Sequence, residues 1–383
     1  MCIMHDTMNV YFDNAATTAV REEVIEKMVS VMRTDFGNPS SSHFLGRSAA
    51  NELAVARKNI ANALRAKPDE IYFTSGGTEA NNWAIQCSAK MLARRGKHII
   101  TSSIEHDAVA EPIKMLEQNG WEITTLKTNN MGFIGSDAFA DALREDTVLA
   151  SIMHVNNETG AINPIEDYSR EIKRRKLGTL LHTDGVQSFC KLPFAVNALG
   201  ADLVSISAHK LHGPKGIGAL YIKGGTKLPA IFLGGSQERG KRAGTEAMPA
   251  IAGFGEAVRL AQLEQEENTK KVTTLSEFTS RRLVEELPEA VIISDNGSPY
   301  ILSISLPGYK SEVLMSYLES EGVCVSKSAA CKKGARSRVL EAMRLKNDVI
   351  DGALRVSFSQ YNTQQEAEYF VQILKKASLI IRK

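Results

Sequence analysis

The stretch SISAHKLHGPKGIGAL, residues 205–220, carries the strongest signal in this chain. An apolar run, 203–206, precedes Lys210 and predicts a buried strand, and a second apolar run, 218–222, follows a turn rich in glycine and proline. A lysine at the end of a buried strand is poorly solvated, and burial disfavours its ammonium form. A neutral lysine amine reacts with aldehydes, so Lys210 is a candidate nucleophile. A solvated loop lysine is the alternative, and it would be preferred if Lys210 stood alone.

Asp184 adds a second part of a site around such a lysine. It ends another short apolar segment, 179–184, that we expect to be a buried strand. Lys210 and Asp184 together suit pyridoxal 5'-phosphate (PLP), which a lysine holds as a Schiff base and whose pyridine nitrogen needs a carboxylate. Gln187, in the turn after Asp184, can donate to the ring hydroxyl oxygen of this cofactor. Because many aspartates after strands only cap helices, Asp184 alone would be weak evidence.

A glycine-rich turn, SGGTE at 75–79, predicts a phosphate site. It lies between an expected strand and a helical pattern with apolar residues on one face. Such a turn directs free backbone N–H groups at an anion, and the helix dipole adds to the attraction. The candidate phosphate ligands are two residues of this turn and two neighbours of Lys210: Gly77, Thr78, Ser207 and His209. For the turn alone, an ordinary helix start is the alternative.

His106 is a further candidate, in the segment EHDAV at 105–109. It follows an expected strand at 98–102, so its imidazole can stack on the cofactor ring and move protons. For a single histidine without context, a structural role is the alternative that we favour.

The order of segments predicts the fold class. From about residue 60 to residue 222, short apolar segments such as 98–102 and 148–155 alternate with helical patterns. This alternation predicts an α/β fold with a mostly parallel sheet, covered by helices, whose ligands bind at the carboxyl ends of the strands. The following candidates come at or just after such ends: Thr78, His106, Asn157, Asp184 and Lys210.

The remainder of the chain predicts a second domain. A long helical stretch runs from Pro249 toward Leu287, and strand and helix patterns follow it up to a C-terminal helix. We expect a large cofactor-binding domain over 18–258 and a smaller α+β domain formed by 1–17 and 259–383.

The bulk composition argues against several classes of function. The 383 residues carry 46 basic and 44 acidic side chains, and a formal net charge of +2 gives no support for nucleic-acid binding. No apolar run approaches the length of a membrane span, and we expect no secretory signal. Five cysteines without CxxC spacing predict reduced thiols in a cytoplasmic protein, with neither a disulfide framework nor a metal site.

Motifs spread over nearly the whole chain resemble those of the cysteine desulfurase family (NifS- and IscS-like), which belongs to the class-V, fold-type-I PLP-dependent enzymes. The matching segments are YFDNAATT (11–18), FGNPSSSH (36–43), TSGGTEANNWAI (74–85), EHDAV (105–109), MHVNNETG (153–160), HTDGVQS (182–188), SAHKLHGPKG (207–216), RAGTE (242–246), SAAC (328–331) and ALRVSFS (353–359). The resemblance implies a large domain with a sheet of the seven-stranded type and a smaller α+β domain.

The resemblance also implies roles for the cofactor-binding residues. Lys210 would form the Schiff base, Asp184 would pair with the pyridine nitrogen, Gln187 would contact the ring hydroxyl and His106 would stack on the ring. The phosphate would be held by Thr78, Ser207 and His209, helped by Thr245 of a neighbouring subunit. The last role implies a homodimer with shared active sites.

Four residues would handle the substrate, which the resemblance implies to be L-cysteine. Asn157 and Arg355 would hold its α-carboxylate, and Asn38 would line the same pocket. The planar fork of Arg355, in an alternating strand pattern, suits a carboxylate; an arginine facing solvent is the alternative. Cys331 would accept the sulfur, and the lysines and arginines around it favour its reactive thiolate form.

The cysteine-bearing segment departs from the family pattern. Ala329 stands where a glycine-serine pair is common, and the basic run after Cys331 is unusual. Cys324, seven residues earlier in an expected strand, is predicted to be a core residue.

The expected function is therefore PLP-dependent removal of sulfur from L-cysteine, giving L-alanine and a persulfide on Cys331. The sulfur would pass to an acceptor protein, in iron–sulfur cluster assembly or tRNA thiolation. Selenocysteine lyase activity, a class-V aminotransferase and a non-catalytic binding module are the alternatives.

Overall fold

The centre of the molecule is a seven-stranded sheet. In the computed structural model, residues 8–294, 297–328 and 336–381 are described. The strand order is β2-β8-β7-β6-β5-β3-β4, and β8 runs opposite to the other six strands of this sheet. The strands are β2 (Ile71–Thr74), β3 (His98–Ser102), β4 (Glu122–Leu126), β5 (Thr147–Ser151), β6 (Leu180–Asp184), β7 (Leu203–Ser207) and β8 (Gly218–Ile222). The prediction of a mostly parallel α/β sheet is confirmed.

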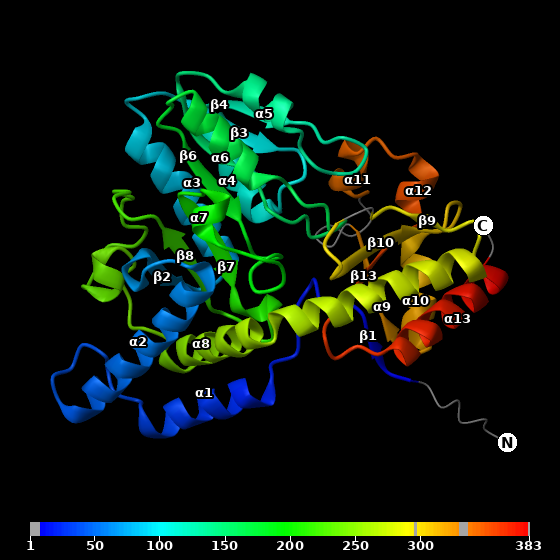
Figure 1. The fold of residues 1–383 in the computed structure, drawn as a ribbon, viewed down its shortest axis with the longest axis horizontal. Coiled ribbons are helices and arrows are strands. Elements are labelled where there is room, and N and C mark those ends of the chain that lie inside the picture. Colours follow the sequence, from blue (N-terminus) through cyan, green and yellow to red (C-terminus); the bar gives the residue numbers. More distant parts are fainter. Residues whose placement is uncertain (1–7, 295–296, 329–335, 382–383) are drawn as a thin grey trace.

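Helices cover both faces of this sheet (Figure 1), which is why inner strands such as β5 and β7 are buried along their whole length. Neighbouring residues of one strand point to opposite faces, so Ile99 packs with α3 and α4 while Ile100 packs with α5 and α6. Further along the sheet, α2 and α8 cover the second of these faces. These helices are α2 (Phe44–Leu64), α3 (Gly77–Leu92), α4 (Asp107–Gln118), α5 (Ser136–Ala142), α6 (Ile165–Arg174), α7 (Val196–Leu199) and α8 (Met248–Leu263), with α1 (Glu22–Thr34) packed on α8.

A second, smaller sheet lies toward the C-terminal part of the chain. Its antiparallel strands follow the order β12 (Ser326–Lys327), β13 (Ala353–Ser357), β10 (Ile301–Ser305) and β9 (Val291–Ile292). The helices of this part are α9 (Gln265–Glu286), α10 (Ser311–Ser320), α11 (Arg338–Ala342), α12 (Asn347–Asp351) and α13 (Gln364–Ile380). In Figure 1, α8 and α9 run nearly in line from the large sheet to the small one, as the long helical stretch predicted.

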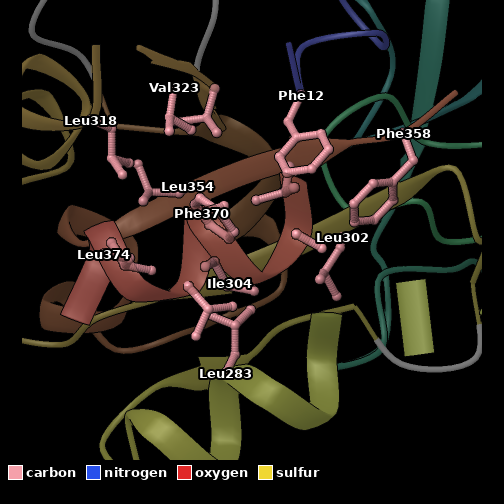
Figure 2. Close-up of a cluster of buried hydrophobic side chains, with 14 of the residues drawn as sticks. Phe12, Leu283, Leu302, Ile304, Leu318, Val323, Leu354, Phe358, Phe370 and Leu374 are labelled. Atoms are coloured by element: carbon pink, nitrogen blue, oxygen red, sulfur yellow. The ribbon is translucent and has the colours of Figure 1, made fainter. Parts of the chain in front are cut away.

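The N-terminal segment belongs to this second core. Strand β1 (Val10–Tyr11) pairs in parallel with β11 (Val323–Cys324). Phe12 is fully buried, and its ring packs edge-on against Phe358 and Phe370, with centroids 5.3 and 5.9 Å away (Figure 2). This arrangement supports the proposed small domain of 1–17 and 259–383, whose boundaries stay a proposal.

Some expected elements differ in detail. The expected strand at 148–155 ends at Ser151, and the chain beyond it turns toward the cavity described below. Cys324 lies in a strand as predicted, but its placement in the core is wrong, because its side chain is exposed at the edge beside β1. Within the part of the chain that the structure describes, no helix has the length and apolar character needed to cross a membrane.

Candidate active site

A cavity of about 340 Å³ opens at the carboxyl ends of the central strands. It collects residues that the sequence places far apart, and most of the predicted site residues line it. These are Gly77, Thr78, His106, Asn157, Asp184, Gln187, Ser207, His209, Lys210 and Arg355. The cavity also has lining residues that the sequence analysis did not single out, namely Ala15, Ala16, Asn81, Ala108, Met153 and Val186.

Lys210 ends a short 3-10 helix, η2 (Ala208–Lys210), directly after β7. Its Nζ donates to the main-chain oxygens of Ala15 at 2.6 Å and Ala16 at 2.7 Å. The N-terminal segment is itself fixed next to Lys210, because both the backbone N and the Oγ1 of Thr18 donate to His209 O at 3.0 Å. Two backbone carbonyls therefore orient the amine at the cavity wall.

Asp184 ends β6 and is nearly buried. Its Oδ2 accepts a hydrogen bond from Asn81 Nδ2 at 2.7 Å, and its Oδ1 accepts one from Val186 N at 3.0 Å. Both bonds fix the orientation of the carboxyl group at the end of β6. Asn81 was missed by the sequence analysis, although it stands in the segment 74–85 that carries the resemblance.

Gln187 follows in the turn after β6. Its Nε2 donates to Ala15 O at 2.9 Å, whereas its Oε1 is buried without a hydrogen-bond partner. Buried amide oxygens are rarely left unpaired in native proteins. The orphaned oxygen therefore points to a donor that a ligand in the cavity would bring.

The N-terminus of α3 forms the expected anion cradle. Its N-cap, Gly76, has φ 153°, and no side chain caps the first turn, so the turn keeps free N–H groups. A Cβ on Gly77 would lie 2.8 Å from Val186 Cγ2, so the space at this position requires glycine. Glu79 forms an ion pair with Arg242, in which Glu79 Oε1 lies 3.0 Å from Arg242 Nε. The carboxylate of Glu79 therefore leaves the N-terminus of α3 open to an anion.

His209, beside Lys210, lines the same cavity as this cradle. Burial is the main cause that lowers the pKa of its imidazole to about 4, and the charges of Lys210, Lys215 and Lys191 act in the same direction. Its Nδ1 lies 3.2 Å from Thr17 Oγ1. The ring is therefore neutral at physiological pH and offers a polar contact rather than a charge.

His106 caps α4 at its N-terminus. Its Nδ1 accepts a hydrogen bond from Ala108 N at 3.0 Å. In the neutral ring the proton is then on Nε2, which is the atom that can exchange a proton with a bound molecule. The side chain lines the cavity but stays exposed, in contrast to Asp184.

Arg355, on β13, is only 2% exposed. Its Nη1 donates to Asn157 O at 2.9 Å, its Nη2 to Asp13 Oδ1 at 2.9 Å, and its Nε is buried without a partner. Asp13 was not among the candidates, although it lies in the segment 11–18 quoted above. The small sheet and the N-terminal segment thus place a guanidinium group in the cavity that the end of β6 also lines.

The remaining predicted residues lie elsewhere. Asn38 is exposed and outside the cavity, and its Oδ1 accepts a hydrogen bond from Ser40 N at 2.9 Å. Thr245 is exposed in the segment between η3 (Gln237–Gly240) and α8, also outside the cavity of its own chain. Cys331 falls outside the described residues, and the described residues nearest to it in sequence are Ser328 and Arg336.

Lys191 is a buried lysine that lies near Lys210. Lys191 lines a small separate cavity together with Lys210, and its Nζ lies 5.5 Å from the centre of the Tyr300 ring. Burial, followed by the charges of Lys210 and Arg355, lowers the pKa of Lys191 to about 7. The sequence analysis did not find this residue, because it follows the Asp184 strand in a segment without a recognisable motif.

Comparison with known proteins agrees with this geometry. The family described as Aminotransferase class-V matches residues 10–370. A cysteine desulfurase IscS from Dictyoglomus turgidum is 43% identical over 96% of this chain and 94% of its own length. A second IscS, from Methanosarcina thermophila, is 40% identical over 95% of this chain and 91% of its own.

Solved structures give the same result. A NifS-like protein superimposes with a TM-score of 0.93 at 37% identity, covering 98% of this chain and all of the other. SspA, solved in complex with cysteine, superimposes with a TM-score of 0.82 at 34% identity over 92% of this chain and 100% of its own. The chain therefore belongs to the aminotransferase class-V family and, within it, to the cysteine desulfurases of the IscS and NifS type.

Proposed function

We propose that this protein is a PLP-dependent cysteine desulfurase, which takes sulfur from L-cysteine and releases L-alanine. The observation that carries the proposal is the meeting of Lys210, Asp184 and the α3 cradle on one cavity. The names of the curated relatives and of SspA with cysteine support the substrate.

The residues present fit the cofactor. The uncapped first turn of α3 with Gly77 suits its phosphate, and Asp184 suits its pyridine nitrogen. The orphaned Oε1 of Gln187 accepts a donor such as the ring hydroxyl group, and Lys210 offers the amine. When bound, PLP would supply an acceptor for the electron pair released at the substrate Cα.

The chain's own groups would handle binding and protons. Arg355, with its free Nε, and Asn157 would hold the substrate carboxylate. The amine of Lys210 would take the Cα proton, because the carbonyl groups of Ala15 and Ala16 hold it at the cavity wall. The Nε2 atom of His106 would exchange the proton of the substrate thiol.

Cys331 would receive the sulfur. Its thiolate would attack the substrate sulfur, so that an S–S bond forms as the Cβ–S bond breaks and the electron pair stays with the carbon fragment. Protonation of that fragment gives alanine, and a persulfide remains on Cys331. An acceptor protein, such as an iron–sulfur scaffold or a tRNA-thiolation protein, would then take the sulfur.

We propose that two copies of the chain share their active sites. Thr245 is exposed and lies away from the cavity of its own chain, as a residue that completes a partner's phosphate site would be. Phe232 and Leu233, in the preceding segment, are 46% and 91% exposed. Large apolar side chains exposed next to each other are typical of a surface that a partner covers.

We also propose a cytoplasmic location, in keeping with the free thiols of Cys87, Cys190 and Cys324 among the described residues.

Two measurements test the proposed function. Borohydride reduction of the purified protein should fix a pyridoxyl group on Lys210, identified by peptide mass spectrometry. The protein should form alanine from L-cysteine, and Cys331→Ser should lose this activity while retaining the pyridoxyl adduct. A Cys331→Ser variant that forms alanine at the wild-type rate excludes the persulfide role.

The same assay separates the alternatives. A selenocysteine lyase would form alanine from selenocysteine and hardly from L-cysteine. A class-V aminotransferase would convert the cofactor to its amine form with an amino donor and would not need Cys331.

A further inference from the structure

Glu105 is a buried carboxyl group next to His106 that the proposed function leaves without a role. It lies in the turn between β3 and α4 and is 2% exposed. Arg338 of α11 donates to the main-chain oxygen of Glu105 at 2.8 Å and pairs with the carboxylate of Asp107, and among the described residues no cationic side chain pairs with the carboxyl group of Glu105. A buried carboxylate without a cation is costly, so the environment favours the uncharged form.

The carboxyl group joins two parts of the cavity wall. Met153 N donates to Oε1 at 3.0 Å and to Oε2 at 3.1 Å, and the Ser102 hydroxyl donates to Oε1. Met153 and His106 both line the cavity. Asn156 Nδ2 adds a second link between the same segments, donating to Ile104 O at 3.0 Å. Glu105 thereby ties the turn that carries His106 to the segment that follows β5.

The surroundings of Glu105 shift the pKa of its carboxyl group in opposite directions. Burial is the largest cause that raises the pKa of Glu105 to about 8, and the charge of Asp184 on β6 adds to it. The hydrogen bonds from Ser102 and Met153 and the charge of Arg338 oppose the rise. Burial is the main cause that raises the pKa of the Tyr168 phenol on α6, and negative charge on Glu105 acts in the same direction.

We propose that Glu105 is a positioning residue: as an uncharged carboxyl group it fixes His106 at the cavity wall without adding negative charge beside Asp184. This inference rests on the proposed function, in which His106 exchanges the proton of the substrate thiol. A glutamine has the same shape and is also uncharged, so it can replace the acid, whereas an alanine removes the acceptor of the Met153 and Ser102 hydrogen bonds.

The charge state is tested without any activity assay. The infrared spectrum of the full-length protein at pH 7 should contain the carbonyl band of a protonated carboxylic acid that is missing in Glu105→Gln. In the wild type this band should fade as the pH rises through about 8. Glu117→Gln, at an exposed position on the helix that His106 caps, is the matched control and should leave the band unchanged. A spectrum that Glu105→Gln does not alter contradicts the uncharged acid.

The positioning role is tested by alanine formation from L-cysteine. Glu105→Gln should keep kcat within about threefold of wild type at pH 7, and Glu105→Ala should lower kcat at least about tenfold with a smaller change in KM. Above about pH 8, the activity of Glu105→Gln should depend less on pH than that of the wild type.

The outcomes distinguish a failure of the positioning role of Glu105 from a failure of the proposed function. Wild-type kcat in Glu105→Ala overturns the positioning role. If Glu105→Ala does not fold, Glu105→Asp, which keeps the acid but withdraws it by one methylene, should show the same loss of kcat, and unchanged kcat there overturns the proposal. A wild type that binds PLP but makes no alanine contradicts the proposed function, whereas the infrared comparison still decides the state of Glu105.

Discussion

At the scale of single residues, the site depends on polar groups that pair across elements. Asp184 is held in place because Asn81, on α3, and Val186 N both donate to it. Lys210 and Gln187 share the carbonyl of Ala15 as an acceptor. No local pattern predicts such pairs, because each partner is chosen by the fold and not by spacing along the chain. Asn81 and Asp13 were missed for this reason.

Replacing Asn81 by alanine should weaken cofactor binding. The change leaves Asp184 Oδ2 buried without its donor, which costs about 1–3 kcal/mol and corresponds to roughly a tenfold or greater loss of PLP affinity if the cost falls on the cofactor complex. Titration of the apo-protein with PLP, followed by absorbance, measures this loss. Asn82→Ala, the neighbouring residue that does not line the cavity, is the control; equal affinities in the two variants would contradict the role given to Asn81.

Lys191 should make stability depend on pH. Its pKa is about 7 in the folded protein, below the ordinary lysine value of 10.5, so between these values the unfolded chain binds a proton that the folded protein does not. Stability should therefore rise with pH in this window, by up to about 1.4 kcal/mol per pH unit, and the gain should be lost as the pH falls toward 7.

Urea unfolding at pH 7 and pH 9 measures this effect. Lys191→Met should lack the rise, while Lys90→Met, at an exposed position, should keep it. A rise of the same size in Lys191→Met would show that other groups cause it.

At the scale of elements, the ends of strands and the beginnings of helices build the cavity. The strand at 98–102 was predicted with its observed bounds, because its short run of mostly β-branched residues has the length and composition typical of a buried strand. The strand expected at 148–155 ends at Ser151, because the residues after it are buried in the wall of the site without continuing the sheet. Burial by itself does not distinguish a strand from a buried turn.

Adding a methyl group at Gly77 should disturb the α3 cradle. Its Cβ would lie 2.8 Å from Val186 Cγ2, so the turn must shift and withdraw its N–H groups from the phosphate. Gly77→Ala should therefore bind PLP at least about tenfold more weakly with little loss of thermal stability. Gly135→Ala, at the N-cap of α5 where the added Cβ meets no atom within 4 Å, is the control.

At the scale of the whole molecule, the N-terminal segment connects the small core to the active site. Phe12 is buried among Phe358, Phe370 and their neighbours, and the next residues supply Asp13 to Arg355 and the carbonyls of Ala15 and Ala16 to Lys210 (Figure 2). The small sheet carries Arg355 to the cavity, while the large sheet carries Lys210 and Asp184. The site therefore depends on how both parts pack together.

Removing the Phe12 ring should affect stability and the site together. Phe12→Ala should lower the free energy of unfolding by about 3–5 kcal/mol, since it leaves a large cavity in a close-packed core. It should also weaken PLP binding, because the carbonyls that hold Lys210 follow it directly in the chain. Urea unfolding and PLP titration measure the two effects, with Phe36→Ala, at a position 66% exposed, as the control. If Phe12→Ala loses stability but keeps its PLP affinity, the proposed link between the small core and the active site is wrong.

The sequence by itself determined the class of fold, the order of the central segments and most of the lining of the cavity. It could do so because the spacing and number of apolar residues are local properties of the chain. In addition, the carboxyl ends of parallel strands meet at the same edge of a sheet. Only the tertiary structure decided that Asn81 serves Asp184, that Asp13 pairs with Arg355, and that Thr245 and Asn38 lie outside the cavity of their own chain. The physical reason is that hydrogen bonds, ion pairs and burial depend on distances in space, which residues far apart in the sequence acquire only when the chain folds.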